Sequence, residues 1–146
     1  VAEIAADNCV LLLWATFPKH PEALRLIEAW GFQYKTVGFV WVKTNPSGNG
    51  FFLGLGWWTR SNAEICLLAV RGKPKRQCAG ISQLIISPRE RHSKKPDIVR
   101  DLAVTLVGDV PRIELFARET SPGWDVWGNE VDCSITLTQS EGDVHE

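Results

Sequence analysis

The sequence predicts an α/β fold with a mostly parallel sheet and helices on both of its faces. Short runs rich in apolar and β-branched residues, typical of strands, alternate with segments whose apolar residues recur at helical spacing. Strands that alternate with helices favour a parallel sheet. Ligands of such sheets bind beyond the carboxyl ends of the strands. The loops that follow the strands are therefore the candidate sites.

The first half of the chain predicts a strand, a helix and two more strands. CVLLLW (9–14) is a continuous apolar run, which is typical of a strand buried on both faces. Apolar residues then recur at helical spacing up to Gly31, which predicts a helix that ends there. The segment 32–43 alternates between apolar and polar residues and predicts the next strand, and AEICLLAV (63–70) predicts another.

The second half predicts a strand over 82–87, a helix over 96–109 and a strand over 112–118. DCSITLT (132–138) is a candidate edge strand, and a short acidic tail follows it to residue 146. No repeat or linker separates these segments, so we expect a single domain over 1–131.

The composition indicates a globular protein without a membrane segment. The chain has 146 residues, of which 45% are apolar and 23% charged. No apolar run reaches the roughly 20 residues of a membrane helix, and the first residues lack the features of a signal peptide. We therefore expect a cytoplasmic protein. Three scattered histidines predict no metal site. The four cysteines are widely spaced and three of them lie in or beside apolar stretches, which indicates small buried hydrophobic residues rather than disulfides.

Two short stretches are strongly basic, RGKPKR (71–76) and PRERHSKKP (88–96). Clustered positive charge suggests contact with an anion. Solvated loops are an equally good interpretation of each stretch taken alone.

Three predicted loops after strands carry polar side chains that could meet at one crevice. These residues are Lys43, Lys95, Arg118, Asn129 and Glu130. Cations beside amide and carboxylate groups suit a ligand with a carboxylate at one end and a ribose at the other. The alternative is a set of solvated charges and a turn. The sequence contains none of the motifs GxGxxG, Walker A, GxSxG or HExxH, which argues against the enzyme classes that use them.

Six motifs in order resemble the adenine-N6 methyltransferase family named after the seventy-kilodalton subunit of the eukaryotic messenger-RNA methyltransferase. They are LLLWAT (11–16), FVWVKTN (39–45), WWTRSNAEICLLAVRG (57–72), IISPRERHSKKPD (85–97), IELFARE (113–119) and PGWDVWGNE (122–130). Their wording is most similar to the bacterial and phage members. The resemblance implies a Rossmann-like methyltransferase fold over 1–131 that binds S-adenosylmethionine and methylates the exocyclic amine of adenine.

The resemblance also implies which residues hold the cofactor. Lys95 matches the lysine that meets the methionine carboxylate of S-adenosylmethionine. The residues that match those around its ribose and adenosine are Arg118, Asn129 and Glu130.

A second set of residues matches the family's substrate-binding positions. Trp41, Lys43 and Asn45 match a strand-end motif beside the target base. The loop expected to cover the active site and to meet a flipped adenine contains Trp58, Arg60, Asn62 and Glu64. The resemblance implies nucleic acid as the partner, with DNA favoured over RNA. The protein is also a candidate to form a homodimer.

One important motif of the family is missing from the sequence. The catalytic signature Asp-Pro-Pro-Trp, which orients the adenine amine, does not occur in the sequence, so the catalytic residues are unknown. We expect the chain to be an amino-terminally truncated and inactive part of a DNA adenine-N6 methyltransferase. The alternatives are a non-catalytic nucleic-acid-binding or scaffolding homologue, and an RNA adenine methyltransferase.

Overall fold

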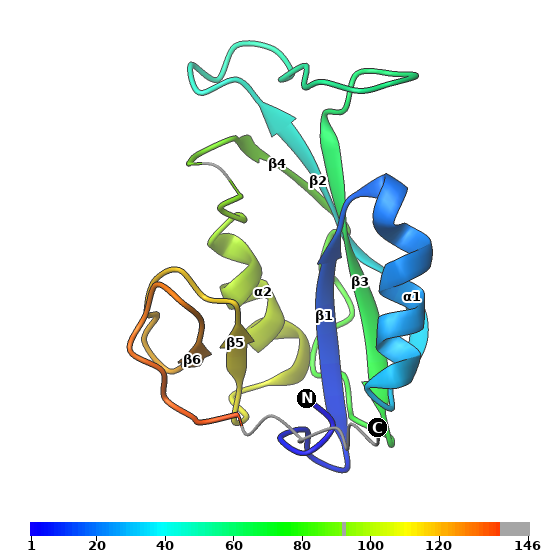
Figure 1. The fold of residues 1–146 in the computed structure, drawn as a ribbon, viewed down its shortest axis with the longest axis vertical. Coiled ribbons are helices and arrows are strands. Elements are labelled where there is room, and N and C mark those ends of the chain that lie inside the picture. The colour runs from blue at the N-terminus through cyan, green and yellow to red at the C-terminus, as the bar shows by residue number, and fades with distance from the viewer. Residues whose placement is uncertain (92, 138–146) are drawn as a thin grey trace, which may run out of the picture. The chain divides into compact units, whose positions relative to one another are not determined.

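The computed structural model describes residues 1–91 and 93–137, which fall into two compact units. The first unit, residues 1–109, contains a four-stranded sheet and two α-helices, and the second, from residue 110, contains two short strands (Figure 1). No helix among the described residues is long and apolar enough to cross a membrane.

The sheet of the first unit is mixed, so the prediction of a mostly parallel sheet is wrong. Its strands lie in the order β1 (Cys9–Ala15), β3 (Ala63–Arg71), β2 (Gln33–Thr44) and β4 (Leu84–Pro88). β3 is antiparallel to both of its neighbours, whereas β2 and β4 are parallel. A parallel neighbour needs a crossover connection, usually a helix. The loop between β2 and β3 contains no helix, and the chain therefore returns in the opposite direction.

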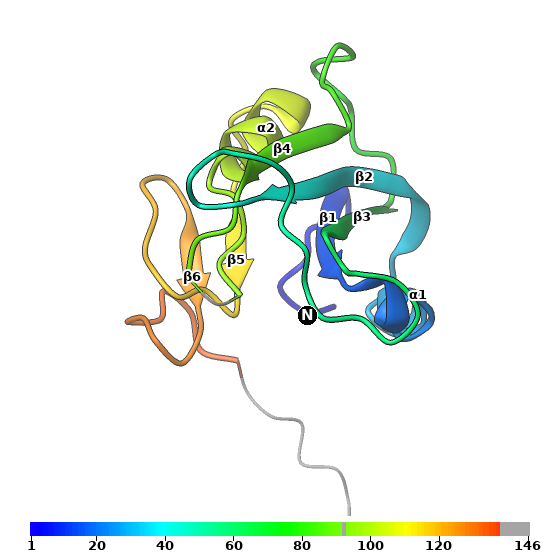
Figure 2. The same cartoon turned by 90° about the horizontal axis from the view of Figure 1, so that it is seen from above.

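The prediction of helices on both faces of the sheet is confirmed within the first unit (Figure 2). Helix α1 (His20–Ala29) follows a short 3-10 turn, η1 (Phe17–Lys19), and packs Ile27 against Leu67 of β3. Helix α2 (Ile98–Val107) packs Val99 in the cluster that contains Cys66, the residue of β3 directly before Leu67. Successive strand residues point to opposite faces, so β3 contributes to both layers.

The predicted end of α1 is also confirmed. Gly31 adopts φ 79°, the left-handed conformation that favours glycine, two residues after the last helical residue. β1, in contrast, is less buried than its apolar sequence predicts. Six of its seven residues are only half-buried, because β1 lies at an edge of the described sheet.

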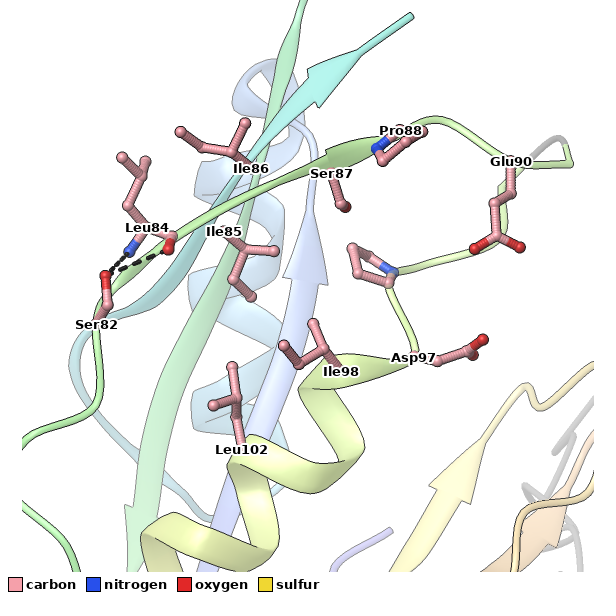
Figure 3. Close-up of a pocket in the computed structure, with 11 residues that line it drawn as sticks. Ser82, Leu84, Ile85, Ile86, Ser87, Pro88, Glu90, Asp97, Ile98 and Leu102 are labelled. Atoms are coloured by element: carbon pink, nitrogen blue, oxygen red, sulfur yellow. Dashed lines mark hydrogen bonds between the residues drawn. The ribbon is translucent and has the colours of Figure 1, made fainter. Parts of the chain in front are cut away.

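β4 forms the other edge of the described sheet and its outer side is partly blocked. The amide of Leu84 donates to the Ser82 hydroxyl at 3.2 Å, and that hydroxyl donates to the Leu84 carbonyl at 3.3 Å (Figure 3). On the face toward α2, Ile85 points from β4 toward Leu102 across a groove of about 580 Å³ (Figure 3).

The second unit contains a parallel pair, β5 (Ile113–Leu115) and β6 (Asp125–Trp127). The strand predicted over 112–118 ends early because Phe116 takes φ 59°, which breaks the extended conformation. The predicted edge strand over 132–138 is wrong for residues 132–137, and residue 138 lies outside the described residues. The backbone there is held by single contacts, such as the amide of Ser134 on the carbonyl of Val126, rather than by a ladder.

Candidate functional site

At one end of the first unit's sheet, the carboxyl ends of three strands lie beside the amino end of the fourth. β1, β2 and β4 run in the same direction, so their carboxyl ends share this end, and the reversed strand β3 begins there. The loop of residues 45–62 follows β2, and the loop of residues 89–97 follows β4 (Figure 1). Functional side chains from all four strands can therefore meet on the face covered by α2.

Glu64, at the start of β3, binds two lysines at this end. Its Oε1 lies 2.5 Å from the Nζ of Lys43 on β2, and its Oε2 pairs with the Nζ of Lys95 in the loop before α2. We call these three residues the lysine–glutamate cluster. The side chains are 12% exposed for Glu64, 15% for Lys43 and 31% for Lys95. The cluster thus contains one mostly buried carboxylate and two ammonium groups.

Two tryptophans form an aromatic wall beside this cluster. The rings of Trp14 and Trp41 meet edge to face, with centroids 6.2 Å apart. Lys43 Nζ lies 4.9 Å from the centroid of the Trp41 ring, and Lys95 Nζ lies 5.7 Å from that of Trp14. Both distances are within the range of a cation–π contact. The indole of Trp41 also donates to the carbonyl of Ser87 at 3.3 Å, which fixes the ring.

The electrostatics of the cluster leave it with one net positive charge. Burial alone would raise the pKa of Glu64, but the hydrogen bonds and charges of Lys43 and Lys95 outweigh it and lower that pKa. Glu64 is therefore ionised at neutral pH and neutralises only one of the two lysines. Behind it, burial raises the pKa of the Cys66 thiol to about 12, so this cysteine is a structural residue. The prediction of buried cysteines is confirmed for Cys66, whereas Cys9 and Cys78 are half-buried and Cys133 is exposed.

The structure brings together four of the predicted site residues: Trp41, Lys43, Glu64 and Lys95. Trp14 and Ser87, which also lie here, were not predicted from the sequence. The Ser87 hydroxyl is buried and has no hydrogen-bond partner among the described residues. Alternate residues of a strand point to the same face of the sheet, and this was the available signal. Trp14 lies near the end of β1, and Ser87 is the register partner of Lys43, so both are near this cluster.

Asn45 and Asn62 shape the base of the loop between β2 and β3. The side-chain amide of Asn45 donates to the carbonyl of Asn49 at 2.8 Å, which holds a turn. The carbonyl of Asn62 accepts the backbone amide of Lys43 at 2.9 Å. In this structure Trp58 is 94% exposed and Arg60 is exposed, so the outer part of the loop does not pack on the cluster.

Arg89 ties this loop to the loop before α2. Its guanidinium lies 4.3 Å from the centroid of the Phe52 ring, and its backbone amide donates to the carbonyl of Thr44 at 3.1 Å. An arginine stacked on an aromatic ring thus stands at the same end of the sheet as the cluster.

The other predicted cofactor residues lie in the second unit. Arg118 Nε is 3.6 Å from Glu130 Oε1, in a pair that is about half exposed, and Asn129 is exposed beside it. Gly128 makes this arrangement possible, because a Cβ there would lie 2.2 Å from the carbonyl oxygen of Ala117. The second unit therefore holds Arg118, Asn129 and Glu130 on two adjacent turns.

The basic stretch 71–76 begins where β3 ends, at the opposite end of the sheet from the cluster. Arg71 Nη1 donates to the carbonyls of Ala2 at 2.7 Å and Ala5 at 3.2 Å, so its charge holds the first turn of the chain. The seven residue steps from Glu64 to Arg71 span roughly 23 Å of strand. The two basic stretches therefore do not form one surface around the cluster.

Comparison with known proteins gives a consistent result. The family model MT-A70 matches residues 1–130. The chain is 37% identical over 150 residues to the type II methyltransferase M.MunI of a Mycoplasma species, which covers 100% of this chain and 60% of that protein. It is 32% identical to human N(6)-adenine-specific methyltransferase METTL4, over 90% of the chain and 30% of the relative. For the human N(6)-adenosine-methyltransferase catalytic subunit METTL3 the identity is 29%, over 88% of the chain and 23% of the relative. The chain thus spans 60% or less of the length of these relatives.

Proposed function

The chain belongs to the MT-A70 family, and on this premise we propose that it is the cofactor- and substrate-binding part of an S-adenosylmethionine-dependent N6-adenine methyltransferase that acts on DNA. One observation carries the proposal. The lysine–glutamate cluster places Lys95 beside a mostly buried carboxylate and an aromatic wall, at the sheet end where α/β proteins bind ligands. Its net positive charge suits the carboxylate of the cofactor.

The residues present fit the proposed cofactor. Lys95 is the more exposed of the two lysines and can donate to the methionine carboxylate. Within the second unit, Arg118, Asn129 and Glu130 offer donors and acceptors that would suit hydroxyl groups such as those of a ribose. The cofactor itself would supply the methyl group.

The loop between β2 and β3 suits a nucleic-acid substrate. Trp57 and Trp58 are 96% and 94% exposed, and exposed aromatic faces stack on unpaired bases. We propose that Trp58, Arg60 and Asn62 contact an extruded adenine and its neighbours, while Trp41, Lys43, Asn45 and Glu64 line the entrance to the site. Base stacking of this kind does not distinguish DNA from RNA. DNA is favoured here because the motifs are most similar to those of bacterial and phage members.

A binding measurement tests the cofactor site. Calorimetry with S-adenosylmethionine should show that Lys95→Ala weakens binding by about 1.5 to 3 kcal/mol, the loss expected for a charge-assisted hydrogen bond. The matched control is Lys75→Ala, an exposed lysine at the other end of the sheet, which should bind as wild type does. Equal affinity of the Lys95 variant and wild type would remove Lys95 from the site.

A transfer assay tests the reaction. Labelled methyl groups are offered with single-stranded DNA and with RNA of the same sequence, and nuclease digestion identifies the modified base. The sequence has no Asp-Pro-Pro-Trp motif to position the amine, so these 146 residues alone should transfer no methyl group. The exposed Trp57 and Trp58 would also suit a second candidate, a non-catalytic nucleic-acid-binding homologue. Nucleic-acid binding without any affinity for S-adenosylmethionine would support that candidate instead.

A further inference from the structure

The lysine–glutamate cluster contains one more cation than its carboxylate needs. We propose that Lys43 is a positioning residue, which holds Glu64 so that Lys95 can leave Glu64 and bind the carboxylate of the ligand. This inference rests on the proposed function, because it assigns a role in cofactor binding to a residue that the sequence analysis placed beside the target base.

The two lysines are held differently. Lys43 belongs to β2, two residues beyond the register partner of Glu64, and its side chain is 15% exposed. Lys95 lies in the loop before α2, and its side chain is 31% exposed. Glu64 presents a separate oxygen to each of them. The lysine that a ligand reaches first is therefore the one on the loop, whereas the one on the strand is fixed.

The burial of Glu64 explains why one cation must stay beside it when the other leaves. A carboxylate that is only 12% exposed is costly to leave without a cation. With Lys43 in place, Lys95 can turn to a ligand and Glu64 keeps one ion pair. Without Lys43, Lys95 is the remaining cation that pairs with Glu64 among the described residues, so that Glu64 and the ligand compete for the same ammonium group.

The aromatic wall supports this exchange. Lys43 lies against the Trp41 ring, which is itself fixed by the Ser87 carbonyl. Lys95 lies beside Trp14, whose ring face favours an ammonium group without fixing its direction. Lys95 can thus change partners while it stays near a ring that stabilises its charge.

Two related ligands separate positioning from a merely structural role. S-adenosylhomocysteine carries the amino-acid carboxylate, whereas 5′-methylthioadenosine has the same nucleoside and a thioether without it. In calorimetry, Lys43→Met should weaken binding of S-adenosylhomocysteine about 10-fold or more, the effect of a lost ion pair of about 1.4 kcal/mol, and leave that of methylthioadenosine within about 2-fold. Lys43→Arg should restore binding, because it returns a cation to Glu64.

The double variant Lys43→Met/Glu64→Gln gives the sharpest result. It removes the competing carboxylate, so Lys95 becomes available again and the affinity for S-adenosylhomocysteine should recover. Thermal melting confirms that each variant is folded. Loss of both ligands in Lys43→Met would indicate a structural role, unchanged affinity would exclude Lys43, and a double variant that stays weak would contradict the exchange.

A titration with a ligand that lacks the nucleoside tests the exchange of Lys95 separately from the proposed function. Free methionine supplies the carboxylate, and the side-chain NMR signals of Lys95 report its partner. In wild type these signals should shift and those of Lys43 should not; in Lys43→Met they should stay unchanged. If wild type binds neither S-adenosylhomocysteine nor methylthioadenosine, the proposed function is wrong. The titration with methionine still shows whether Lys95 leaves Glu64 for a carboxylate ligand. Signals of Lys95 that remain constant in wild type would overturn the proposed exchange.

Discussion

The two basic stretches are alike in sequence and differ in what the fold does with them. Residues 71–76 follow β3, and their first arginine is used inside the molecule, where Arg71 binds the carbonyls of Ala2 and Ala5. Residues 88–96 follow β4, and their last lysine reaches Glu64 at the opposite end of the sheet. The stretch 71–76 thus stabilises the first turn of the chain, whereas the stretch 88–96 contributes a lysine to the candidate site.

Strand direction is the cause of this difference. β3 alone runs opposite to the other three strands of its sheet, so the residues that follow it leave at the far end. Charge density in a sequence therefore indicates a site only after the direction of the preceding strand is known. The following predictions test this comparison.

The largest expected effect is on stability at the cluster. Glu64→Ala leaves two partly buried ammonium groups close together without their anion, and should lower the free energy of unfolding by about 3 kcal/mol. Urea denaturation measures it. The exposed Glu28→Ala is the matched control and should change stability by less than about 0.5 kcal/mol. A loss no larger than that of the control would mean that the cluster does not stabilise the fold.

The same cluster should make stability depend on pH. The folded-state pKa of Glu64 lies below its ordinary value of 4.5, so its contribution is fully present above that value and is lost as pH falls through the folded-state pKa. The urea midpoint of wild type should therefore fall on acidification below about pH 4.5 by more than that of Lys43→Met/Glu64→Gln. Parallel curves for the two proteins would show that another carboxyl group dominates.

A smaller effect is expected at the other basic stretch. Arg71→Ala removes two charge-assisted hydrogen bonds to backbone carbonyls and should destabilise the protein by about 1 to 2 kcal/mol. Lys75→Ala, in the same stretch and exposed, should have almost no effect. Amide hydrogen exchange of residues 1–8 should rise in the arginine variant only. Equal exchange in both variants would exclude Arg71 from holding this turn.

The smallest effect is expected on nucleic-acid binding from the far stretch. At 0.15 M salt, charges roughly 23 Å from the cluster lie beyond two Debye lengths. Replacing Lys73, Lys75 and Arg76 together by alanine should therefore change the affinity for single-stranded DNA by less than about 2-fold. Arg89→Ala, beside the cluster, should weaken it several-fold. A large loss from the triple variant, with a flatter salt dependence, would place phosphate at both ends of the sheet.

The sequence was informative where a local pattern decides the structure. The apolar runs and the helical spacing before Gly31 were identified correctly, and Lys43, near the end of β2, and Lys95, after β4, lie together at Glu64. The direction of β3 was not, because it depends on how the loop of residues 45–62 returns to the sheet. Trp14 and Ser87 were missed for a related reason: their relevance arises from neighbours on other strands. Phe116 has a positive φ that no residue pattern around it indicates.

The outer side of β4 limits how another chain could join the molecule. Gln83 and Arg89 direct backbone groups toward β2, so by alternation those of Leu84, Ile86 and Pro88 point outward. The Ser82 hydroxyl occupies both polar groups of Leu84, and Pro88 has no amide hydrogen. Among these three residues of β4, Ile86 alone offers both a backbone donor and a backbone acceptor to another chain. A single such residue is too short a template for a fifth strand. Although β4 has exposed apolar side chains, its edge therefore disfavours the repeated addition of strands that leads to fibrils.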